Sequence, residues 1–502
     1  MPLRPLTLVL NSNNSQKATV LLPADVPDAH AWILKEARNK LRIRSLKRVF
    51  LRGGAELQPG AALDPDSDAS EVWVSKGEEY IGPAPKQGGS VPGEAKDVVR
   101  VIAQESYVDP EAVTQLKAVA ALPGVRLAAG MPDLHPGNRF PIGCAIVAEG
   151  IYPALIGSDV GCGIALYHLA AIPARLDPPK LAAQLRGLDD PWDGDVAVWL
   201  ARYGIARASE FDRTALGTVG AGNHFAEVCR LEKALDGEAC DLLGLDGTHL
   251  YLMVHSGSRG LGASILEKQT RTSANPYIPP DSPELPAYVA EHDYAVAWAV
   301  ANRDLIAHRI SRCLFPGDGG DDDQPDSDRL TLRKIVDITH NSVVRVDGTA
   351  PVLGDLSQAA PGEERNRDVW IHRKGAAPAD RGVAPCPGSR GDFSWLLMPT
   401  GDGANNAHSL AHGAGRMYPR AAMHKYKDQK GGKAEREALA STALGSEVVC
   451  ADPALLVEER PEAYKSCEGV VRDLELAGAA RGVAVLRPVV TYKIREGARR
   501  KA

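Results

Sequence analysis

Residues 407–420 read AHSLAHGAGRMYPR, and we expect the fold to be built around the chemistry of this stretch. It contains two histidines, His408 and His412, and the second is followed directly by the small residues Gly413–Gly415. Small residues let backbone N–H groups approach a ligand closely, as in loops that bind phosphate. A histidine beside such a loop can ligate a metal, transfer a proton or act as a nucleophile. A glycine-rich turn with a surface histidine explains these residues equally well, so the rest of the chain has to decide.

The bulk composition is that of a globular protein, with 44% hydrophobic and 24% charged residues. A chain of 502 residues exceeds what one core usually supports, so two or three domains are expected. No apolar run reaches the length of a membrane-spanning helix, and residues 1–30 lack a signal-peptide pattern. We therefore expect no membrane partner and a cytoplasmic location, or a nuclear one in a eukaryote.

Charge and cysteine content weaken the case for two classes of function. The net charge of −6 gives no support to a nucleic-acid partner, although a basic face can sit on an acidic protein. The eight cysteines are scattered without a CxxC pair, which argues against a zinc finger. A single cysteine can still join a composite metal site.

Residues 1–78 are predicted to form a separate module. Two strand-like runs, a helix over residues 28–41 and two further strand-like runs give a β-β-α-β-β order, which resembles a ubiquitin-like β-grasp. The ending VWVSKGEEY resembles doublecortin domains. Such a module binds an unknown protein partner, or it is a small extension packed on the main domain. Residues 79–95 are rich in Pro and Gly and are predicted to be a linker, and residues 96–502 form the main domain.

Four further segments place metal-binding or phosphate-binding side chains among glycines. One carboxylate, one thiolate and three imidazoles in these segments are a donor set that suits Mn, Co or Zn. Five side chains complete two coordination spheres only if one ligand bridges, and a thiolate can bridge. This pattern predicts a metal-dependent phosphoryl-transfer enzyme, whereas each histidine taken alone is more often structural. The segments are IGSDVGCGIALY with Asp159 and Cys162, GTVGAGNHFAEV with His224, MVHSGSRGLG with His255 and IVDITHNSV with His340.

The order of the motifs resembles that of the RtcB-type RNA ligases. PDLHPGNRFPIG (residues 132–143), GSDVGCG, GNHFAE, HSGSRG, ITHN, HRKGA, PGSRG and AHGAGR follow one another as in that family, from about residue 95 to Lys493. The resemblance implies an α+β fold, in which a catalytic domain of mixed β-sheets with flanking helices follows the small β-grasp-like domain. The N-terminal module is an addition to the usual family core.

The resemblance also implies roles for individual residues. Asp159 and His224 would bind one metal ion, His255 and His340 the other, and Cys162 would bridge them. His412 would be the nucleophile that becomes guanylated. The implied guanylate pocket consists of Asn223, His224, Phe225, Ala226, Glu227, His340, Asn341, Pro387, Gly388, Ser389, Arg390, Ser394, His412, Gly413, Ala414, Gly415 and Lys493.

The implied activity uses GTP and two Mn²⁺ ions to join RNA ends bearing a 3′-phosphate or 2′,3′-cyclic phosphate to 5′-hydroxyl ends, in tRNA splicing or RNA repair. The resemblance also implies two partners, which are cleaved RNA, such as tRNA halves, and an archease-like activator. The alternatives are a paralogue for damage-specific RNA repair, a metal-dependent cyclic phosphodiesterase and a partner-binding subunit without activity. Two departures from the family pattern are expected to affect nucleotide and RNA preference. Arg390, Gly391 and Asp392 within GSRGDFS change a wall of the implied guanylate pocket, and Pro419 after HGAGR stands where a serine is common in the family.

Overall fold

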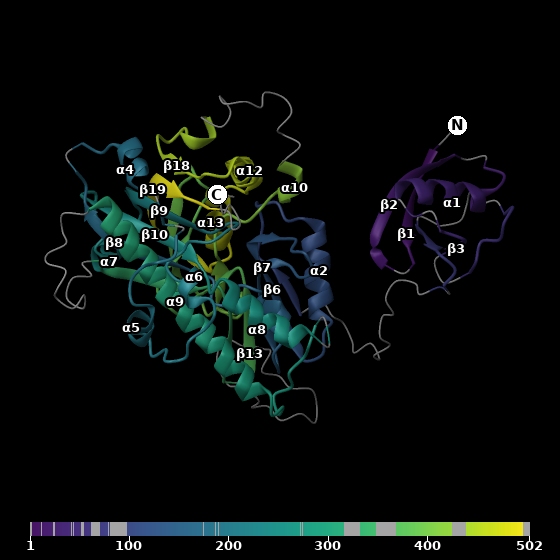
Figure 1. Cartoon of the computed structure of the whole chain (residues 1–502), viewed down its shortest axis with the longest axis horizontal. Helices are drawn as coiled ribbons and strands as arrows, with labels where there is room; N and C mark the ends of the chain where they lie inside the picture. The colour runs from purple at the N-terminus through teal and green to yellow at the C-terminus, as the bar shows by residue number, and fades with distance from the viewer. Residues whose placement is uncertain are drawn as a thin grey trace. The chain divides into compact units, whose positions relative to one another are not determined.

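The computed structural model describes residues 3–494 except 62–70, 79, 81–97, 316–331, 348–367, 424–437 and isolated positions in residues 12–54, 174–189 and 272–274. The chain divides into two compact units, residues 1–93 and 94–502 (Figure 1). Most of the predicted linker over residues 79–95 lies outside the described residues. None of the described helices is both long and apolar enough to cross a membrane.

The described residues of the N-terminal unit form a four-stranded sheet and one helix. The sheet order is β2-β1-β4-β3, with β1 and β4 parallel and the other pairs antiparallel. Ile33 and Ala37 of the helix are buried against the sheet, and Asp28 caps its first turn. The elements follow the predicted β-β-α-β-β order, and the assignment to a ubiquitin-like class stays a prediction. The elements are β1 (Leu3–Leu10), β2 (Asn13–Pro23), α1 (Ala29–Lys40), β3 (Arg48–Leu51) and β4 (Glu71–Ser75).

The larger sheet of the C-terminal unit has eight strands among the described residues. Its order is β11-β8-β10-β9-β19-β16-β15, and β18 pairs with β19. Every pair is antiparallel except β18 with β19. The strands are β8 (Gly163–Ala171), β9 (Phe225–Ala234), β10 (His249–Ser256), β11 (Lys334–Thr339), β15 (Ala384–Cys386), β16 (Ser394–Pro399), β18 (Glu447–Val449) and β19 (Ala480–Tyr492).

The smaller sheet of this unit packs against one face of the larger one. Its order is β12-β13-β7-β6-β5, and a two-stranded sheet of β14 and β17 lies beside it. Met131 and Val147 of the smaller sheet share one core with Ile164 and Met253 of the larger sheet. The strands are β5 (Val99–Val101), β6 (Val125–His135), β7 (Ile142–Ala148), β12 (Asn341–Val346), β13 (Val369–Lys374), β14 (Ala376–Pro378) and β17 (Ser409–Ala411).

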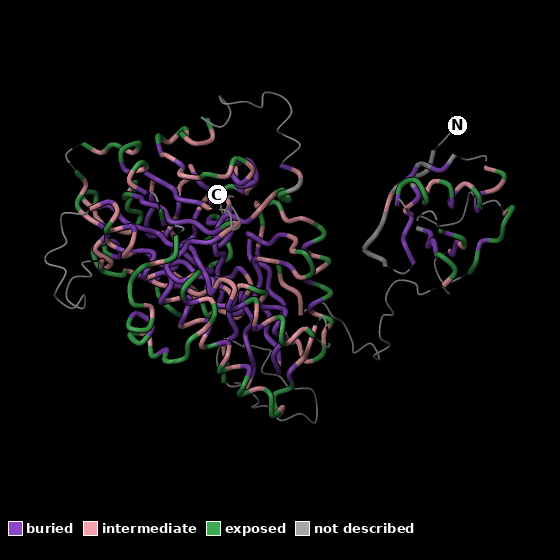
Figure 2. The backbone as a smooth tube through the Cα atoms, in the orientation of Figure 1, coloured by how far each residue is buried: buried purple, intermediate pink, exposed green. Residues whose placement is uncertain are grey.

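Helices cover the two outer faces, so the C-terminal unit has four layers. The 30-residue helix α9 packs on the far face of the larger sheet, where Ile306 and Ile310 meet Ala165 and Leu252. Helix α2 covers the smaller sheet through Leu116. The strands are therefore buried on both faces, as Figure 2 shows. These helices are α2 (Pro110–Ala120) and α9 (Leu285–Leu314), and α9 matches the helix-rich stretch predicted over residues 285–315.

The remaining helices are short and lie mostly at the edges of the layers. Helices α4 and α5 fall in the helix-rich stretch predicted over residues 178–210. Helix α13 packs on β19 and β6. The helices are α3 (Pro153–Ile156), α4 (Pro178–Gln184), α5 (Val196–Ala201), α6 (Asp212–Ala215), α7 (Gly237–Leu243), α8 (Gly260–Thr270), α10 (Arg420–Met423), α12 (Pro453–Glu458), the 3-10 turn η5 (Pro461–Ala463) and α13 (Cys467–Leu476).

Candidate metal centre and nucleotide pocket

The candidate metal ligands lie at the same end of four adjacent strands of the larger sheet. Cys162 and His224 directly precede β8 and β9, whereas His255 is near the end of β10 and His340 follows the end of β11. Neighbouring strands in the order β11-β8-β10-β9 run antiparallel, so the start of one strand lies beside the end of the next. Candidate ligands that are far apart in the sequence, between residues 159 and 340, therefore lie close together in the fold.

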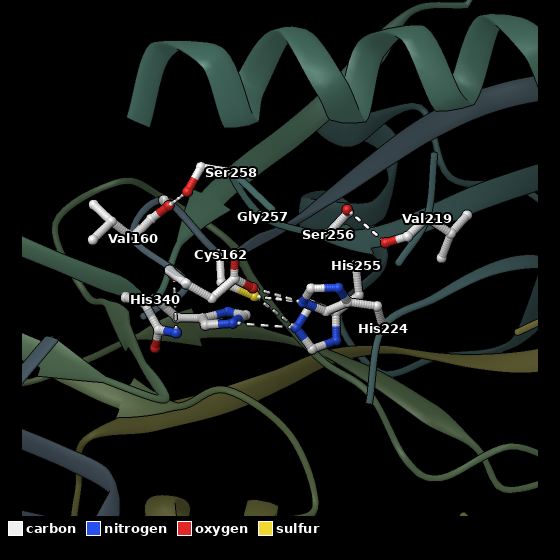
Figure 3. A network of polar contacts seen from close by, with 12 residues as sticks. Val160, Cys162, Val219, His224, His255, Ser256, Gly257, Ser258 and His340 are labelled. Carbon is white, nitrogen blue, oxygen red and sulfur yellow. Dashed lines mark hydrogen bonds and ion pairs between the residues drawn. The ribbon is translucent and has the colours of Figure 1, made fainter. Parts of the chain in front are cut away.

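The candidate ligands converge on the Cys162 thiol. Its Sγ lies 3.2 Å from His224 Nε2 and 3.3 Å from His255 Nε2. His340 Nε2 lies 3.2 Å from His255 Nε2, and Asp159 Oδ2 lies 2.8 Å from His224 Nε2. Figure 3 shows the Cys162 thiol pointing toward the neighbouring imidazoles of His224 and His255, with the His340 imidazole on the other side of the thiol. All five side chains predicted as ligands thus come together.

The chemistry of the five donors fits metal ions better than it fits a hydrogen-bonded cluster. Burial lowers the pKa values of His255 and His340 well below the usual range, which leaves ring nitrogens with free lone pairs. Burial raises the pKa of the Cys162 thiol well above its usual range, and a metal ion reverses this by replacing the thiol proton. Asp159 Oδ1 is buried and has no hydrogen-bond partner among the described residues. This donor set is suited to two borderline divalent ions.

Helix α9 fixes the backbone around two of the candidate ligands. Arg303 is fully buried, and its guanidinium donates to the carbonyls of Gly161 (2.9 Å) and Ser256 (3.0 Å), next to Cys162 and His255. Asp337 of β11 balances its charge at 2.9 Å from Nε. The neighbouring Asn302 donates to the Gly257 carbonyl and accepts from the Gly217 amide. The sequence pattern gave no sign of this role, because both residues lie inside a helix far from the motifs.

His412 lies beside the candidate metal centre, and a buried carboxylate contacts its ring. Its Nδ1 lies 2.7 Å from Oδ2 of Asp133, which is fully buried. The His412 ring centroid is 4.7 Å from that of His340 and 6.5 Å from that of His255. With Nδ1 engaged by the carboxylate, Nε2 is the nitrogen left to act on a ligand. Asp133 lies in the PDLHPGNRFPIG motif, but nothing in its spacing signalled this contact.

Lys465 holds the segment of Asp133 against the glycine loop. Its Nζ donates to the carbonyls of Pro132 and Leu134, both at 2.8 Å, and its backbone N–H donates to Gly415. Gly415 has φ of +67°, and a Cβ there would lie 2.4 Å from the Asp133 carbonyl oxygen. Only glycine fits this position, so the close approach of the two segments explains the second glycine of HGAGR.

A cavity of about 970 Å³ opens beside His412. Volumes of this size hold drug-sized or nucleotide-sized ligands. Phe225 begins β9, Lys493 directly follows β19, and the loops over residues 387–390 and 412–415 form another part of the wall. The predicted pocket residues that line it are Asn223, Phe225, Pro387, Gly388, Ser389, Arg390, His412, Gly413, Ala414, Gly415 and Lys493.

Some predicted pocket residues do not line this cavity. Glu227 is buried, its Oε2 accepts from Thr491 at 2.6 Å, and burial raises its pKa to about 7. Ala414 lines the cavity, but its backbone N–H donates to the Pro387 carbonyl at 3.0 Å. This N–H therefore joins two loops and does not face a ligand, unlike the expectation for a phosphate loop. The other predicted residues outside the lining are His224, Ala226, His340, Asn341 and Ser394.

Cationic side chains dominate the wall of the cavity. Glu459 is a buried carboxylate there, 3.1 Å from Arg416, 3.2 Å from Arg420 and 3.7 Å from Lys493. Burial opposes its ionisation, but these cations outweigh that effect and lower its pKa. Tyr464 donates a hydrogen bond to the same carboxylate. Further cations on the wall are Arg139, Lys374 and Arg390. The excess positive charge suits a polyanionic ligand.

Arg390 lies in the cavity wall and also supports that wall through hydrogen bonds to the backbone. Its guanidinium donates to three backbone carbonyls, at Glu459 (3.0 Å), Leu439 (2.5 Å) and Leu456. Arg390 lines the cavity, yet these bonds hold the end of α12 and therefore Glu459 in place. The long side chain can reach this helix end from its loop, whereas the sequence around it does not reveal the partner.

Replacing Arg390 by methionine is expected to destabilise the fold. Three buried carbonyls lose their donor, which costs about 2–4 kcal/mol. The midpoint of thermal unfolding, followed by circular dichroism, should fall by at least about 3 °C. The exposed Arg213 provides a matched Arg→Met control that should shift the midpoint by less than about 1 °C. Equal midpoints for the two variants would show that the three hydrogen bonds contribute little.

His408, the second histidine of the opening stretch, has a structural role. Its Nε2 lies 2.7 Å from the Asp402 carbonyl, and it is not among the residues that line the cavity. Ala407 and His408 have φ of +50° and +46°. This left-handed turn leads the chain into β17 and so sets the position of His412.

Fold and site together define a two-sheet enzyme-like scaffold with a candidate thiolate–imidazole metal centre beside a cationic cavity. The family model described as tRNA-splicing ligase RtcB matches residues 115–189 and 193–494. The chain therefore belongs to the RtcB family.

Individual relatives agree with this assignment. The chain is 40% identical over 400 residues to RNA-splicing ligase RtcB2 of Escherichia coli, covering 79% of this chain and 96% of the relative. It is 28% identical over 500 residues to tRNA-splicing ligase RtcB of Aeropyrum pernix, with 80% and 97% covered. A third relative, RNA-splicing ligase RtcB of Mycobacterium tuberculosis, is 28% identical over 459 residues, with 76% and 100% covered. The N-terminal unit lies outside the segments matched by the family model.

Proposed function

We propose that this protein is an RNA ligase that uses GTP and two Mn²⁺ ions. It joins RNA ends that carry a 3′-phosphate or a 2′,3′-cyclic phosphate to 5′-hydroxyl ends through a histidine–GMP intermediate. Membership of the RtcB family and the names of the relatives support ligation of RNA. The observation that carries the proposal is the position of His412, between the buried Asp133 carboxylate and the imidazole of His340, at the wall of a cationic cavity.

His412 is suited to attack the α-phosphate of GTP. Asp133 accepts the Nδ1–H at 2.7 Å, which fixes the tautomer with a lone pair on Nε2. Attack forms a bond from Nε2 to phosphorus and releases pyrophosphate. The Asp133 carboxylate stabilises the positive charge that develops on the imidazole. Arg416, Arg420 and Lys493 on the cavity wall are positioned to bind phosphate oxygens.

The next steps transfer GMP and then remove it. An oxygen of the RNA 3′-phosphate attacks the GMP phosphorus, the phosphorus–nitrogen bond breaks, and His412 is regenerated. The 5′-hydroxyl of the second RNA strand then attacks the activated 3′-phosphate and displaces GMP. A cyclic phosphate is first opened by water to a 3′-phosphate. The cationic wall of the cavity supplies charge complementary to both RNA ends.

Asp159, Cys162, His224, His255 and His340 would hold the two metal ions. Bound there, divalent ions supply Lewis-acid stabilisation of charge on a phosphoryl group. Mn²⁺ accepts carboxylate and imidazole ligands, and a thiolate can serve two ions at once. Arg303 and Asn302 hold the ligand backbone from behind.

RNA is the proposed macromolecular partner, in the form of tRNA halves or other cleaved strands, and the proposed location is the cytoplasm. An archease-like activator and a protein partner of residues 1–78 complete the proposal. Damage-specific repair and cyclic phosphodiesterase activity without ligation are the competing functions, and joining of two test strands distinguishes a ligase from a phosphodiesterase.

The proposal is tested with two short RNA strands, one of which has a labelled 3′ end. The 3′ end is prepared as a 3′-phosphate, a 2′,3′-cyclic phosphate or a free diol, and each is incubated with GTP or ATP and with Mn²⁺, Co²⁺, Zn²⁺ or Mg²⁺. We expect joined RNA from the phosphate and cyclic-phosphate ends with GTP and Mn²⁺, and none from the diol. Opening of the cyclic phosphate without joining would instead identify a phosphodiesterase.

Replacing Asp133 by asparagine is expected to slow guanylation of His412. The substitution removes the negative charge that faces Nδ1, so the tautomer is no longer fixed and the charge on the imidazole is no longer stabilised. We expect the rate of guanylation to fall by a factor on the order of a hundred. The rate is measured from the transfer of label from α-³²P-GTP to the protein, and metal content should stay unchanged. Asp293→Asn is the control, because Asp293 also contacts a histidine Nδ1 (2.9 Å) but is exposed. A rate within about threefold of the wild-type rate would remove Asp133 from the mechanism.

A further inference from the structure

We propose that His168, Asp246 and His249 form a second, separate metal site that binds one borderline divalent cation such as Zn²⁺. The inference does not depend on the proposed ligase function, and it uses none of the residues assigned to that activity. The three residues each offer a ligand atom, and these atoms lie within 4.8 Å of one another.

The new site lies on the two strands that also carry the candidate metal centre. Strand β8 begins directly after Cys162 and carries His168 six positions further on, whereas β10 begins at His249 and ends just past His255. Because the strands are antiparallel, both new ligands lie at the same end of the pair, opposite the thiolate centre. Six residues of extended chain span about 20 Å. The two sites are therefore too far apart to share an ion.

The two imidazoles face each other next to the carboxylate. Their ring centroids are 4.5 Å apart, and His249 Nδ1 lies 2.8 Å from Asp246 Oδ2. Tetrahedral coordination with bonds of about 2.0–2.2 Å requires ligand atoms about 3.3–3.6 Å apart. The side chains are half-buried, so a movement of roughly one ångström brings three ligand atoms around one ion. An ion would take the place of the contact between Asp246 and His249.

The surroundings hold the ligands in the manner found at metal sites. The backbone carbonyl of Gly244 lies 3.1 Å from His168 Nε2, and when it accepts a hydrogen bond from Nε2–H, Nδ1 keeps a lone pair for an ion. Thr248 donates to Asp246 Oδ1 from its backbone N–H and from its hydroxyl, both at 2.6 Å. Tyr251 accepts from the Asp246 backbone N–H at 2.7 Å. The carboxylate is ionised and oriented before any ion arrives.

The donors and the local charge define the class of ion. Two imidazoles and one carboxylate suit Zn²⁺, Co²⁺ or Ni²⁺, and three protein ligands leave positions for water. Arg333 opposes a cation, since its charge is close enough to lower the pKa of His168 after burial has done so. The Arg333 guanidinium, however, donates to the Leu243 carbonyl, and its side chain is exposed. Water therefore screens its charge. We therefore expect weaker binding than at the buried thiolate centre.

An ion at this position would link strands β8 and β10 where their pairing is irregular. The register of β10 against β8 shifts between Leu250 and Tyr251, directly beside His249 and His168. A metal bond between the strands removes freedom at this shift. Since the same strands present Cys162 and His255, fixing their register stabilises the frame of the candidate metal centre.

The experiment counts ions on the full-length chain. Protein stripped with a chelator is dialysed against buffered Zn²⁺, and bound zinc per chain is measured by mass spectrometry. We expect three ions for the wild type, two for H168Q and for H249Q, and three for H308Q, whose half-buried imidazole lies outside the cluster. If the thiolate centre takes no zinc, the expected counts become one, zero, zero and one, so failure of that centre remains distinguishable.

Equal counts in the wild type and both cluster variants would overturn the proposal. Thermal unfolding of the metal-free proteins checks that the variants are folded. A second measurement needs no variant: modification of histidines in the wild type by diethyl pyrocarbonate, mapped on peptides. Zn²⁺ should protect His168 and His249, and equal modification with and without zinc would also reject the site.

Discussion

Cys162→Ala is expected to remove both metal ions from the candidate centre at once. Its Sγ lies 3.2 Å and 3.3 Å from the nearest nitrogens of His224 and His255, which belong to the two proposed ion sites. A Cys162 thiolate shared by two ions would be a ligand of each. Without it, each ion keeps two protein ligands, which is fewer than structural or catalytic sites normally have.

Metal content after dialysis against Mn²⁺ measures this effect. The wild type should hold two ions, Cys162→Ala none, and Cys240→Ala two, since Cys240 is a buried cysteine of α7 away from the centre. Ligation should fall below detection in Cys162→Ala only. Retention of either ion by this variant would rule out a bridging thiolate, provided that its thermal midpoint shows a folded protein.

His412→Ala is expected to abolish formation of the protein–GMP adduct, because it removes the atom that forms the bond to phosphorus. The adduct should be labile in acid, as a phosphoramidate is, and its label should map to the peptide containing residues 407–420. Asp133, Lys465 and the metal ligands remain in place in this variant, so GTP and metal binding should persist.

His408→Ala is the matched control for His412→Ala. It lies four residues earlier, contacts the Asp402 carbonyl and is not among the residues that line the cavity. We expect this variant to retain at least about half of the wild-type labelling, because a small structural change has only a small effect. Label that survives in His412→Ala, or that disappears only in His408→Ala, would place the nucleophile elsewhere.

Much of the candidate site could be predicted from the sequence, because its ligands sit in short glycine-rich segments at strand ends. The five side chains named as metal ligands lie together, and most of the predicted pocket residues line one cavity. Glycines at strand ends are needed where backbones approach closely, as at Gly415. Such local requirements leave a trace in the sequence.

The contacts that position the site could not be predicted, because they join residues distant in the chain. Asp133 and His412 are 279 positions apart, and Lys465 reaches Pro132 across 333 positions. Arg303 sits in the middle of a long helix and shows no local motif. Pairings of this kind depend on the order of strands in two packed sheets, which no periodicity in one segment specifies.

Arg390 is a residue whose unusual identity was visible in the sequence but whose contacts were not. Its departure from the family pattern was visible in the sequence, and a change in the pocket wall was the natural expectation. Its three bonds to backbone carbonyls show that the side chain holds the end of α12, and through it Glu459 and the cations around that carboxylate. A substitution near a ligand can therefore act through the support of the wall.

The most direct test of the central claim follows the fate of GMP on the protein. The protein is labelled with α-³²P-GTP and freed of nucleotide, and RNA with a 3′-phosphate is then added together with RNA bearing a 5′-hydroxyl. We expect the label to leave His412, to pass through the RNA 3′ end and to appear as free GMP, with one joined RNA for each GMP released. Joined RNA without loss of label from the protein, or label that stays on the protein in the presence of both strands, would contradict a histidine–GMP intermediate.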